Sequence, residues 1–380
     1  MVSMPVPSPE QLMDALSRVE DPEIHRPITE LGMVENISVD DAGVVTTTIL
    51  LTVAGCPLQS TIEKEATEAL LALEGVTSVS VTLGVMNDQQ RKDLGTKLRG
   101  GKTERENPFA RPDNLTRIYA IASGKGGVGK SSVTTNLAAA MAKQGLKVGV
   151  LDADIYGFSV PRMMGVSYAP TQVDDMIMPP EAHGVKVMSV GMFVPEGQPV
   201  VWRGPMLHRA IQQFLADVYW GDLDALLLDL PPGTGDVAIS IGQLLPNAEI
   251  VVVTTPQSAA AEVAERAGSI AAQTNQRVVG VVENMAWLQM PDGSRNEIFG
   301  SGGGATVAAS LSAIMGTEVP LLGQVPIDVA LREGGDAGAP VAVCAPDSPA
   351  GAELTKIATT LATRARGLAG RKLGVSVTPH

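Results

Sequence analysis

The residues with the clearest chemistry lie in the stretch SGKGGVGKSS, from Ser123 to Ser132. From Gly124 to Ser131 they have the spacing G-x-x-x-x-G-K-[ST] of a phosphate-binding loop. Such a loop holds phosphate oxygens with backbone N–H groups and with the positive end of the helix that follows. We expect Lys130 to reach the β- and γ-phosphates and the Ser131 hydroxyl to bind Mg²⁺. The alternative is a glycine-rich turn that binds nothing. It is disfavoured because the whole motif is present and lies between an apolar run and a helical pattern.

The loop also contains a second lysine, Lys125, which the motif does not require. Four glycines in the loop let the backbone approach a phosphate closely. The loop residues that we expect to bind ATP are Gly124, Lys125, Gly126, Gly127, Val128, Gly129, Lys130, Ser131 and Ser132.

Carboxylates follow two apolar segments that we expect to be neighbouring strands. ALLLDL closes on Asp229, and VLDAD contains Asp152 and Asp154. In nucleoside triphosphatases an aspartate at the end of such a strand orients Mg²⁺ or its water shell. We therefore predict that Asp152 and Asp229 act on Mg²⁺ through water and that Asp154 positions the attacking water. A helix N-cap or a surface loop are the alternatives. The following turn, PPGTGD, could present the N–H of Gly233 to the γ-phosphate.

The composition favours a folded protein with an acidic surface. The 380 residues carry a net charge of −13, which disfavours general binding to nucleic acid. No segment approaches the length of a membrane span, and the N-terminus MVSMPVPSPE lacks the pattern of a secretory signal. The two cysteines, Cys56 and Cys344, lie too far apart in sequence to suggest a disulfide framework. We expect a cytoplasmic protein that binds neither nucleic acid nor membrane.

Two differently patterned regions must position these residues. Residues 1–95 predict a small α/β unit, with a capping box before the first helix and alternating strand patterns after it. Residues 96–115 carry charges, Gly and Pro without periodicity and predict a linker. From 116 to 380, short apolar runs alternate with helical segments, which indicates a mostly parallel, doubly wound α/β sheet. Ligands bind at the carboxyl ends of the strands in such a sheet.

Several strings in the second region are typical of one family. They are GKGGVGKS, DADIYG, WRGPM (Trp202 to Met206) and DLPPGTGD. Together they resemble the Mrp/ApbC group of ATPases, within the wider MinD and ParA family that has a second lysine in the phosphate loop. The resemblance covers the chain from about Thr116 to Val341. The first region, with ILLTVAGCPLQSTI, resembles the iron–sulfur-assembly-type domain that often precedes such an ATPase.

This resemblance implies a homodimer with two ATP molecules at its interface, in which Lys125 reaches the phosphates bound by the partner. It implies that Asn284 in VENM and the backbone around Pro326 in GQVPID hold adenine. The implied function is an ATP-hydrolysing carrier that binds iron–sulfur clusters and transfers them to apoproteins, or works with assembly proteins. The candidate catalytic residues are then Lys125, Lys130, Asp154 and Asp229.

The chain departs from the family where many members carry a Cys-x-x-Cys pair that bridges a cluster between subunits. Met290 and Gly293 stand at these positions. A thioether is a weak ligand for iron in these clusters and glycine offers no side chain, so the bridged cluster cannot form at this site. A smaller departure is Phe158 in DIYGFS, where the family usually has proline.

Cys56 is the remaining candidate ligand for an iron–sulfur cluster. It directly precedes Pro57 at a predicted helix N-terminus, a position that lowers the pKa of a thiol and favours metal binding or reactivity. The alternative is a small buried cysteine. We expect Cys344 to be structural.

Two other functions remain open from the sequence. A MinD- or ParA-like spatial-organising ATPase would need to bind membrane or DNA, which the acidic charge and the absence of an amphipathic tail disfavour. A phosphate-loop kinase or activating enzyme for a small molecule would need an acceptor pocket, and the sequence shows no obvious one.

Overall fold

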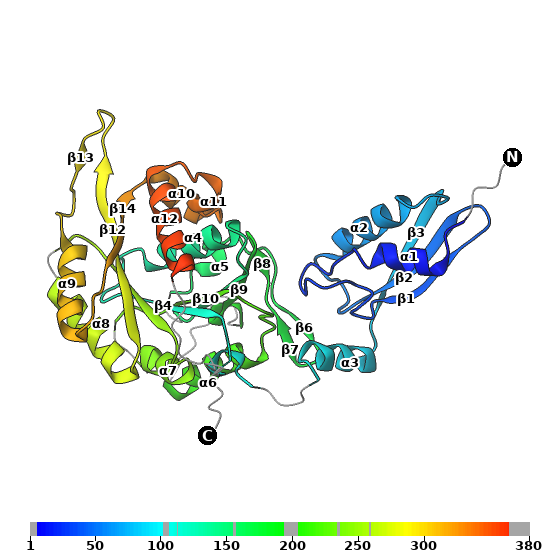
Figure 1. Cartoon of the computed structure of the whole chain (residues 1–380), viewed down its shortest axis with the longest axis horizontal. Coiled ribbons are helices and arrows are strands. Elements are labelled where there is room, and N and C mark those ends of the chain that lie inside the picture. The colour runs from blue at the N-terminus through cyan, green and yellow to red at the C-terminus, as the bar shows by residue number, and fades with distance from the viewer. Residues whose placement is uncertain are drawn as a thin grey trace, which may run out of the picture. The chain divides into compact units, whose positions relative to one another are not determined.

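The computed structural model describes residues 6–101, 106–111, 113–154, 157–193, 204–233, 236–257 and 260–364. Parts of the strings DADIYG, WRGPM and DLPPGTGD, and almost all of the C-terminal segment RARGLAGRK, lie outside these residues. The described residues form two compact units (Figure 1). The first contains residues 6–101, 168–180 and 217–221, and the second contains the others.

The first unit is built on a three-stranded sheet with the strand order β1-β2-β3. The β1 and β2 strands are antiparallel and the β2 and β3 strands are parallel. Its elements are α1 (Pro9–Leu16), β1 (Val34–Val39), β2 (Val44–Leu51), α2 (Gln59–Leu71), β3 (Ser78–Val85) and α3 (Asp88–Leu98). The predicted capping box is confirmed, since Ser8 and Gln11 exchange hydrogen bonds at the start of α1.

Helix α3 extends past residue 95, into the segment without periodicity. Asn87 caps it, and the side chain of Gln90 accepts a hydrogen bond from the Asn87 N–H, so the two form a second capping box. The signal N-x-x-Q was therefore present in the sequence. It is easily missed because α3 is mostly polar and has only two buried residues.

The core of the first unit is completed by segments that are distant in sequence. Strands β6 (Thr171–Val173) and β7 (Met176–Met178) form an antiparallel hairpin. Val173, Met176 and Met178 are buried in the same apolar cluster as α1, β2 and α2. Arg99 forms ion pairs with the turn of this hairpin, at Asp174 and Asp175. The first unit is thus not continuous in sequence.

The second unit contains a nine-stranded sheet within its described residues. The strand order is β13-β12-β11-β4-β10-β5-β9-β8, and β14 also pairs with β12. The strands are β4 (Arg117–Ala122), β5 (Val148–Asp152), β8 (Glu181–Ala182), β9 (Val185–Ser189), β10 (Ala225–Asp229), β11 (Glu249–Thr254), β12 (Arg277–Gln289), β13 (Arg295–Asn296) and β14 (Leu321–Ile327). Only β8 and β13 pair antiparallel, which confirms the predicted α/β class with a mostly parallel sheet.

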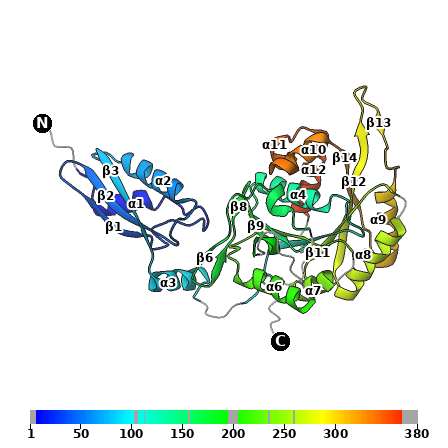
Figure 2. The ribbon, with the colours of Figure 1, turned by 180° about the vertical axis from the view of Figure 1, so that it is seen from behind.

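Helices cover both faces of this sheet, as its almost wholly buried strands require. Figure 2 shows α4, α11 and α12 over one face and α6 and α7 over the other. The helices are α4 (Lys130–Lys143), α5 (Val160–Met163), α6 (Gly204–Asp217), α7 (Asp236–Leu244), α8 (Ala260–Thr274), α9 (Gly303–Met315), α10 (Val329–Ala337), α11 (Val341–Cys344) and α12 (Pro349–Thr363), with short 3₁₀ turns at Pro108–Ala110 and Val190–Phe193. Among the described residues, no helix has the length and apolar character to cross a membrane.

Candidate nucleotide-binding site

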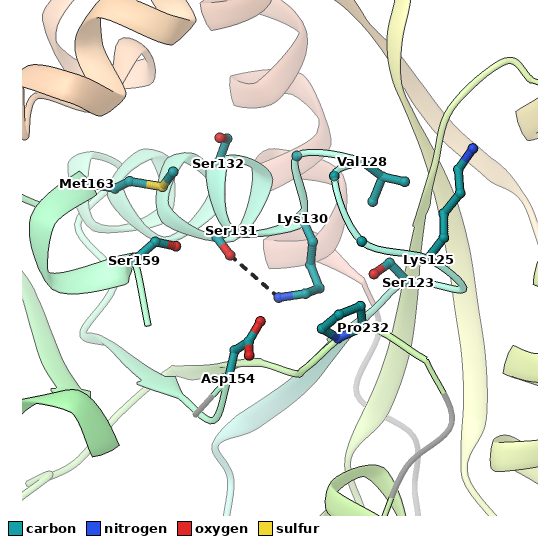
Figure 3. A pocket seen from close by; sticks show the side chains of 13 residues that line it. Ser123, Lys125, Val128, Lys130, Ser131, Ser132, Asp154, Ser159, Met163 and Pro232 are labelled. Carbon is teal, nitrogen blue, oxygen red and sulfur yellow. Dashed lines mark hydrogen bonds between the residues drawn. The ribbon is translucent and has the colours of Figure 1, made fainter. Parts of the chain in front are cut away.

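The predicted phosphate loop connects β4 to α4 and surrounds a cavity of about 210 Å³ (Figure 3). Asp154 and Pro232, from loops after β5 and β10, face it across this cavity. The cavity therefore lies at the carboxyl ends of the parallel strands, as the sheet type predicts. The lining residues are Ser123, Lys125, Gly126, Gly127, Val128, Gly129, Lys130, Ser131, Ser132, Asp154, Ser159, Met163 and Pro232.

The path of the loop depends on glycines in the left-handed conformation. Gly127 and Gly129 have φ values of +79° and +78°. A Cβ atom at Gly129 would lie 2.2 Å from Nδ2 of Asn284, so only glycine fits there. Val128 between them is buried, and its carbonyl accepts a hydrogen bond of 2.9 Å from Asn284 Nδ2. Asn284 thus stabilises the backbone of the loop through this hydrogen bond.

Asp229 at the end of β10 is the centre of a buried polar cluster. Its Oδ2 lies 2.8 Å from Lys130 Nζ and accepts a 2.5 Å hydrogen bond from Ser131 Oγ. Its Oδ1 accepts a 2.7 Å hydrogen bond from Thr134 Oγ1. The two charged side chains are 6% and 1% exposed, so the pair must compensate for lost hydration. Sequence reasoning missed Thr134, although it lies four residues after Lys130 and so on the same face of α4.

Asp152 lies next to Asp229 in the register of β5 and β10, and it is fully buried. Its carboxylate accepts hydrogen bonds from the N–H groups of Asp154 and Val160 and from Ser189 Oγ. Burial, reinforced by the charge of Asp229, raises the pKa of Asp152 to about 7. Neither Asp152 nor Asp229 is part of the cavity lining, and the Asp152 carboxylate holds the backbone of the loop that leads to α5. Its action on Mg²⁺ through water stays a prediction.

Asp154 reaches the cavity because β5 ends at Asp152. In Figure 3 its carboxylate points towards Lys130 and Ser131 from the opposite side. Phe158, where the family usually has proline, is 46% exposed and its ring covers Gly191, where any Cβ would collide with it.

The two lysines of the loop have different surroundings. Lys130 is buried against Asp229. Lys125 extends away from Lys130, and its Nζ donates a 2.6 Å hydrogen bond to Oε1 of Gln257 (Figure 3). The structure of a single chain therefore does not direct Lys125 to the phosphates of its own site.

The remaining predicted nucleotide contacts lie outside the cavity lining. The N–H of Gly233 donates to the carbonyl of Ser123 at 2.9 Å, so here it serves an internal contact and not a phosphate. Asn284 lies opposite Val325 in the pairing of β12 with β14, which brings it close to Pro326. Its Oδ1 is buried and has no hydrogen-bond partner among the described residues.

The prediction of a lowered pKa at Cys56 is wrong. Helix α2 begins at Gln59, so Cys56 is not its N-cap, and the side chain is 5% exposed in the apolar core of the first unit. Burial raises the pKa of the thiol and outweighs the opposing hydrogen bond from the Leu58 N–H, and the nearby charges of Glu23 and Asp21 add to the rise. Within the described ranges, no group of three or more His, Cys, Asp or Glu side chains is arranged to hold a metal ion.

Met290 and Gly293 lie in the turn between β12 and β13, a hairpin that extends from the second unit in Figure 1. The Met290 N–H donates to the Ser294 carbonyl, and Gly293 has a φ of +85°. Asp292 accepts two hydrogen bonds from Ser294, which lower the pKa of its carboxyl. The turn is closed by its own polar groups. The other cysteine, Cys344, is exposed at the end of α11.

Comparison with known proteins finds relatives over nearly the whole chain. The family model described as NUBPL iron-transfer P-loop NTPase matches residues 114–362, and the one described as iron-sulfur cluster assembly protein matches residues 9–81. The "iron-sulfur cluster carrier protein" of Mycobacterium tuberculosis is 62% identical over 96% of each chain. That of Deinococcus radiodurans is 44% identical over 92% of this chain and 94% of its own.

A solved structure shares the fold of the second unit. The nucleotide-binding protein of Archaeoglobus fulgidus, in complex with ADP, is 37% identical. It covers 62% of this chain and 92% of its own, with a TM-score of 0.52. The likeness thus extends to a protein that holds a nucleotide.

Proposed function

Because this chain belongs to the NUBPL iron-transfer P-loop NTPase family, we propose that it is an ATP-hydrolysing carrier that binds iron–sulfur clusters and transfers them to apoproteins. The observation that carries the proposal is the convergence of Lys130, Ser131 and Thr134 on Asp229 beside the phosphate cavity. The names of relatives that match 96% of the chain support the cargo.

The loop supplies the phosphate-binding part of the reaction. Backbone N–H groups at the start of α4 and the ammonium group of Lys130 would hold the β- and γ-phosphates. Lys130 would exchange its contact with Asp229 for the phosphates, and Asp154 would orient the attacking water from across the cavity. The hydroxyl of Ser131 and the carboxylate of Asp229 are oxygen donors of the kind that Mg²⁺ prefers, so these residues fit a Mg²⁺ ion. When bound, Mg²⁺ would neutralise charge on the transferring phosphate.

Asn284 supports adenine as the base. Its Nδ2 is used by Val128, whereas its buried Oδ1 lacks a partner in the described structure. An unpaired buried acceptor costs free energy unless a ligand satisfies it. The 6-amino group of adenine can donate to it, whereas guanine presents an acceptor carbonyl at the same ring position. We propose that Asn284 and the backbone near Pro326 select ATP over GTP.

We propose that hydrolysis requires a homodimer. Lys125 is half-buried at the cavity, and its Nζ contacts Gln257 and is directed away from Lys130, so its charge is not used by the phosphate-binding groups of its own subunit. Removing its charge should spare ATP binding and lower hydrolysis, because only the transition state needs the additional cation. ATP binding and phosphate release by Lys125→Ala measure the two effects separately.

The cargo must be held without the usual cysteine pair. Met290 and Gly293 supply no thiolate, so the thiolates come from Cys56, from Cys344 or from a partner protein that presents the cluster. Cys56 is buried, and its core would have to open before the thiolate could bind iron. Both cysteines are free, which fits the reducing cytoplasm where we place this reaction.

Anaerobic reconstitution with iron and sulfide tests the carrier function. We expect bound iron and sulfide in the wild-type chain and transfer to an apo [4Fe–4S] dehydratase, measured by its recovered activity with and without ATP. The matched control is Cys56→Ala/Cys344→Ala, which lacks both thiols. If wild type retains no more iron than this variant and activates the acceptor no better, the chain does not itself carry a thiolate-bound cluster. Equal iron content of wild type and Cys56→Ala alone excludes Cys56 as the ligand.

A further inference from the structure

We propose that Gln257 is a positioning residue of the ATPase, which holds Lys125 away from the phosphates in the single subunit. The hairpin segment, from Glu283 to Gly303, controls the position of Gln257. This inference rests on the proposed dimeric ATPase. Its first support is the 2.6 Å hydrogen bond from Lys125 Nζ to Gln257 Oε1. Figure 3 shows the Lys125 side chain directed away from Lys130.

The backbone at the start of the loop is fixed, so the freedom of Lys125 lies in its side chain. A Cβ atom at Gly124 would lie 2.8 Å from Cγ2 and 3.0 Å from Cα of Val263 in α8. Arg266, also in α8, donates a 2.9 Å hydrogen bond to the Gly124 carbonyl. Helix α8 thus clamps the residue before Lys125. Rotation of the Lys125 side chain alone therefore decides whether its Nζ contacts Gln257 or another acceptor.

The position of Gln257 depends on the base of the hairpin segment. Gly303, the first residue of α9, is so close to the chain before Gln257 that a Cβ atom there would lie 2.7 Å from the carbonyl carbon and oxygen of Pro256. The N–H of the next residue, Gly304, donates a 2.7 Å hydrogen bond to Glu283. The segment between Glu283 and Gly303 is the one that includes the β12–β13 hairpin. A displacement of this segment therefore reaches Gln257 through direct backbone contact.

The hydrogen bond between Lys125 and Gln257 is of a kind that can break readily. Gln257 is exposed and neutral, so it offers the ammonium group one hydrogen bond and no ion pair. Because the donor is charged, such a bond shifts the lysine between two positions by about tenfold to a hundredfold. An acidic residue would hold the lysine more firmly through its charge. The hold lowers the fraction of subunits that are ready for the partner, and so raises the protein concentration needed for hydrolysis.

The test measures the specific rate of ATP hydrolysis against protein concentration for wild type, Gln257→Ala and Gln257→Glu. We expect Gln257→Ala to lower the concentration at half-maximal rate by about tenfold to a hundredfold and Gln257→Glu to raise it. The KM for ATP should change little, because Lys130 and the loop bind the nucleotide. In a Lys125→Ala background both Gln257 effects should vanish. Effects of equal size in the two backgrounds overturn the proposal, because Gln257 then does not act through Lys125.

The role of the hairpin base is tested by Gly303→Ala, which must displace Pro256. Its control is Gly335→Ala in α10, where a Cβ atom meets nothing within 4 Å. Gly303→Ala should lower the concentration at half-maximal rate, as Gln257→Ala does, because it displaces Gln257. Gly335→Ala should leave this concentration unchanged. Thermal unfolding shows whether each variant is folded. A folded Gly303→Ala with the wild-type concentration dependence removes the hairpin from the proposal, and the Gln257 variants decide the rest.

Lys130→Ala separates this inference from the proposed function. If wild type hydrolyses ATP no faster than Lys130→Ala, the ATPase itself is absent and both proposals fail. If wild type is much faster than Lys130→Ala while Gln257 and Lys125 act independently, the ATPase stands and only the role of Gln257 is wrong.

Discussion

The phosphate cavity and the β12–β13 hairpin belong to the same unit but are built in opposite ways. At the cavity, buried side chains from α4 and β10 satisfy one another before any ligand is present, as in the contact of Lys130 with Asp229. At the hairpin, the turn at Met290 and Gly293 is exposed and closed by its own backbone and by Asp292. One chain therefore already holds the phosphate-binding part of the nucleotide site, whereas its hairpin turn supplies no thiolate for a cluster.

This difference teaches which function a single chain can perform alone. Phosphate binding needs N–H groups and a lysine, which a loop and one helix provide together. A cluster needs several thiolates, and this chain has two cysteines, Cys56 and Cys344, that lie in different units. Cargo binding consequently depends on rearrangement, a second subunit or a partner protein.

The largest effect on hydrolysis and stability is expected at Lys130. Lys130→Ala removes the cation that faces the phosphates and leaves Asp229 buried without its ion pair. We expect hydrolysis to fall at least about 100-fold and the free energy of unfolding to fall by about 3–5 kcal/mol. Phosphate release and urea unfolding measure these changes, with the exposed Lys143→Ala at the end of the same helix as the control. A Lys130→Ala variant with wild-type stability would show that the cluster around Asp229 is not prebuilt as described.

The second effect concerns carboxylates in the two regions. Asp152, beside Asp229, has a pKa raised by burial, whereas Asp292 in the hairpin turn has a pKa lowered by its bonds from Ser294. The folded state keeps the Asp152 proton up to about pH 7, while the unfolded state loses it near pH 4. Stability must therefore fall as the pH rises through this window, by at most about 1.4 kcal/mol per pH unit.

Asp152→Asn tests this sign. Relative to wild type, the variant should gain free energy of unfolding as the pH rises from 4 to 7, measured by urea unfolding without nucleotide or Mg²⁺. Asp292→Asn is the matched control and should show no such gain, because its carboxyl favours the charged form. A difference between Asp152→Asn and wild type that is constant with pH would mean that Asp152 is ionised throughout.

The third effect is expected when the hairpin turn is given side chains that can bind a ligand, as the cavity already has. Met290→Cys/Gly293→Cys, placed in the Cys56→Ala/Cys344→Ala background, restores two thiolates to each chain. We expect iron and sulfide to bind after anaerobic reconstitution, in a ratio of about one cluster per two chains. The cost is about 1–2 kcal/mol of stability, because Gly293 has a positive φ that other residues adopt with strain.

The single variant Met290→Cys is the control for this design, since one thiolate per chain supplies half of the ligands. If the double variant binds no more iron than the single one, the turn does not present positions 290 and 293 to a shared cluster. The absence of cysteines would then not be the feature that distinguishes the hairpin from the cavity.

The sequence predicted the cavity well because its chemistry lies in one contiguous motif with a fixed geometry. Lys130 and Ser131 must follow a loop such as GKGGVG at the start of a helix, and Asp229 ends an apolar strand in the same sheet. What failed depended on partners that are distant in sequence. The pKa of Cys56 is set by its burial and by Asp21 and Glu23, which no local pattern reveals.

Long-range packing also explains why the sequence does not reveal the whole core of the first unit. Val173 and Met178 lie within residues 116–380, which we predicted as one α/β region, yet they are buried with α1 and β2. The two strands of this hairpin have three residues each, too few for a pattern that shows which core they join. Which of several apolar surfaces a short strand covers is decided by the folded whole and not by its own residues.

The smallest effect, and the finest test of how prebuilt the cavity is, concerns Thr134. Its hydroxyl oxygen lies 2.7 Å from Asp229 Oδ1 and 3.0 Å from the carbonyl oxygen of Lys130, and the shorter distance favours donation of its one proton to Asp229. Thr134→Val keeps the shape and leaves Oδ1 without this donor, so the free energy of unfolding should fall by about 1–2 kcal/mol. Thr135→Val, which loses only bonds to α4 carbonyls, is the control and should lose less. Equal losses in urea unfolding would mean that Asp229 gains nothing from Thr134, and that Lys130 and Ser131 alone define the site.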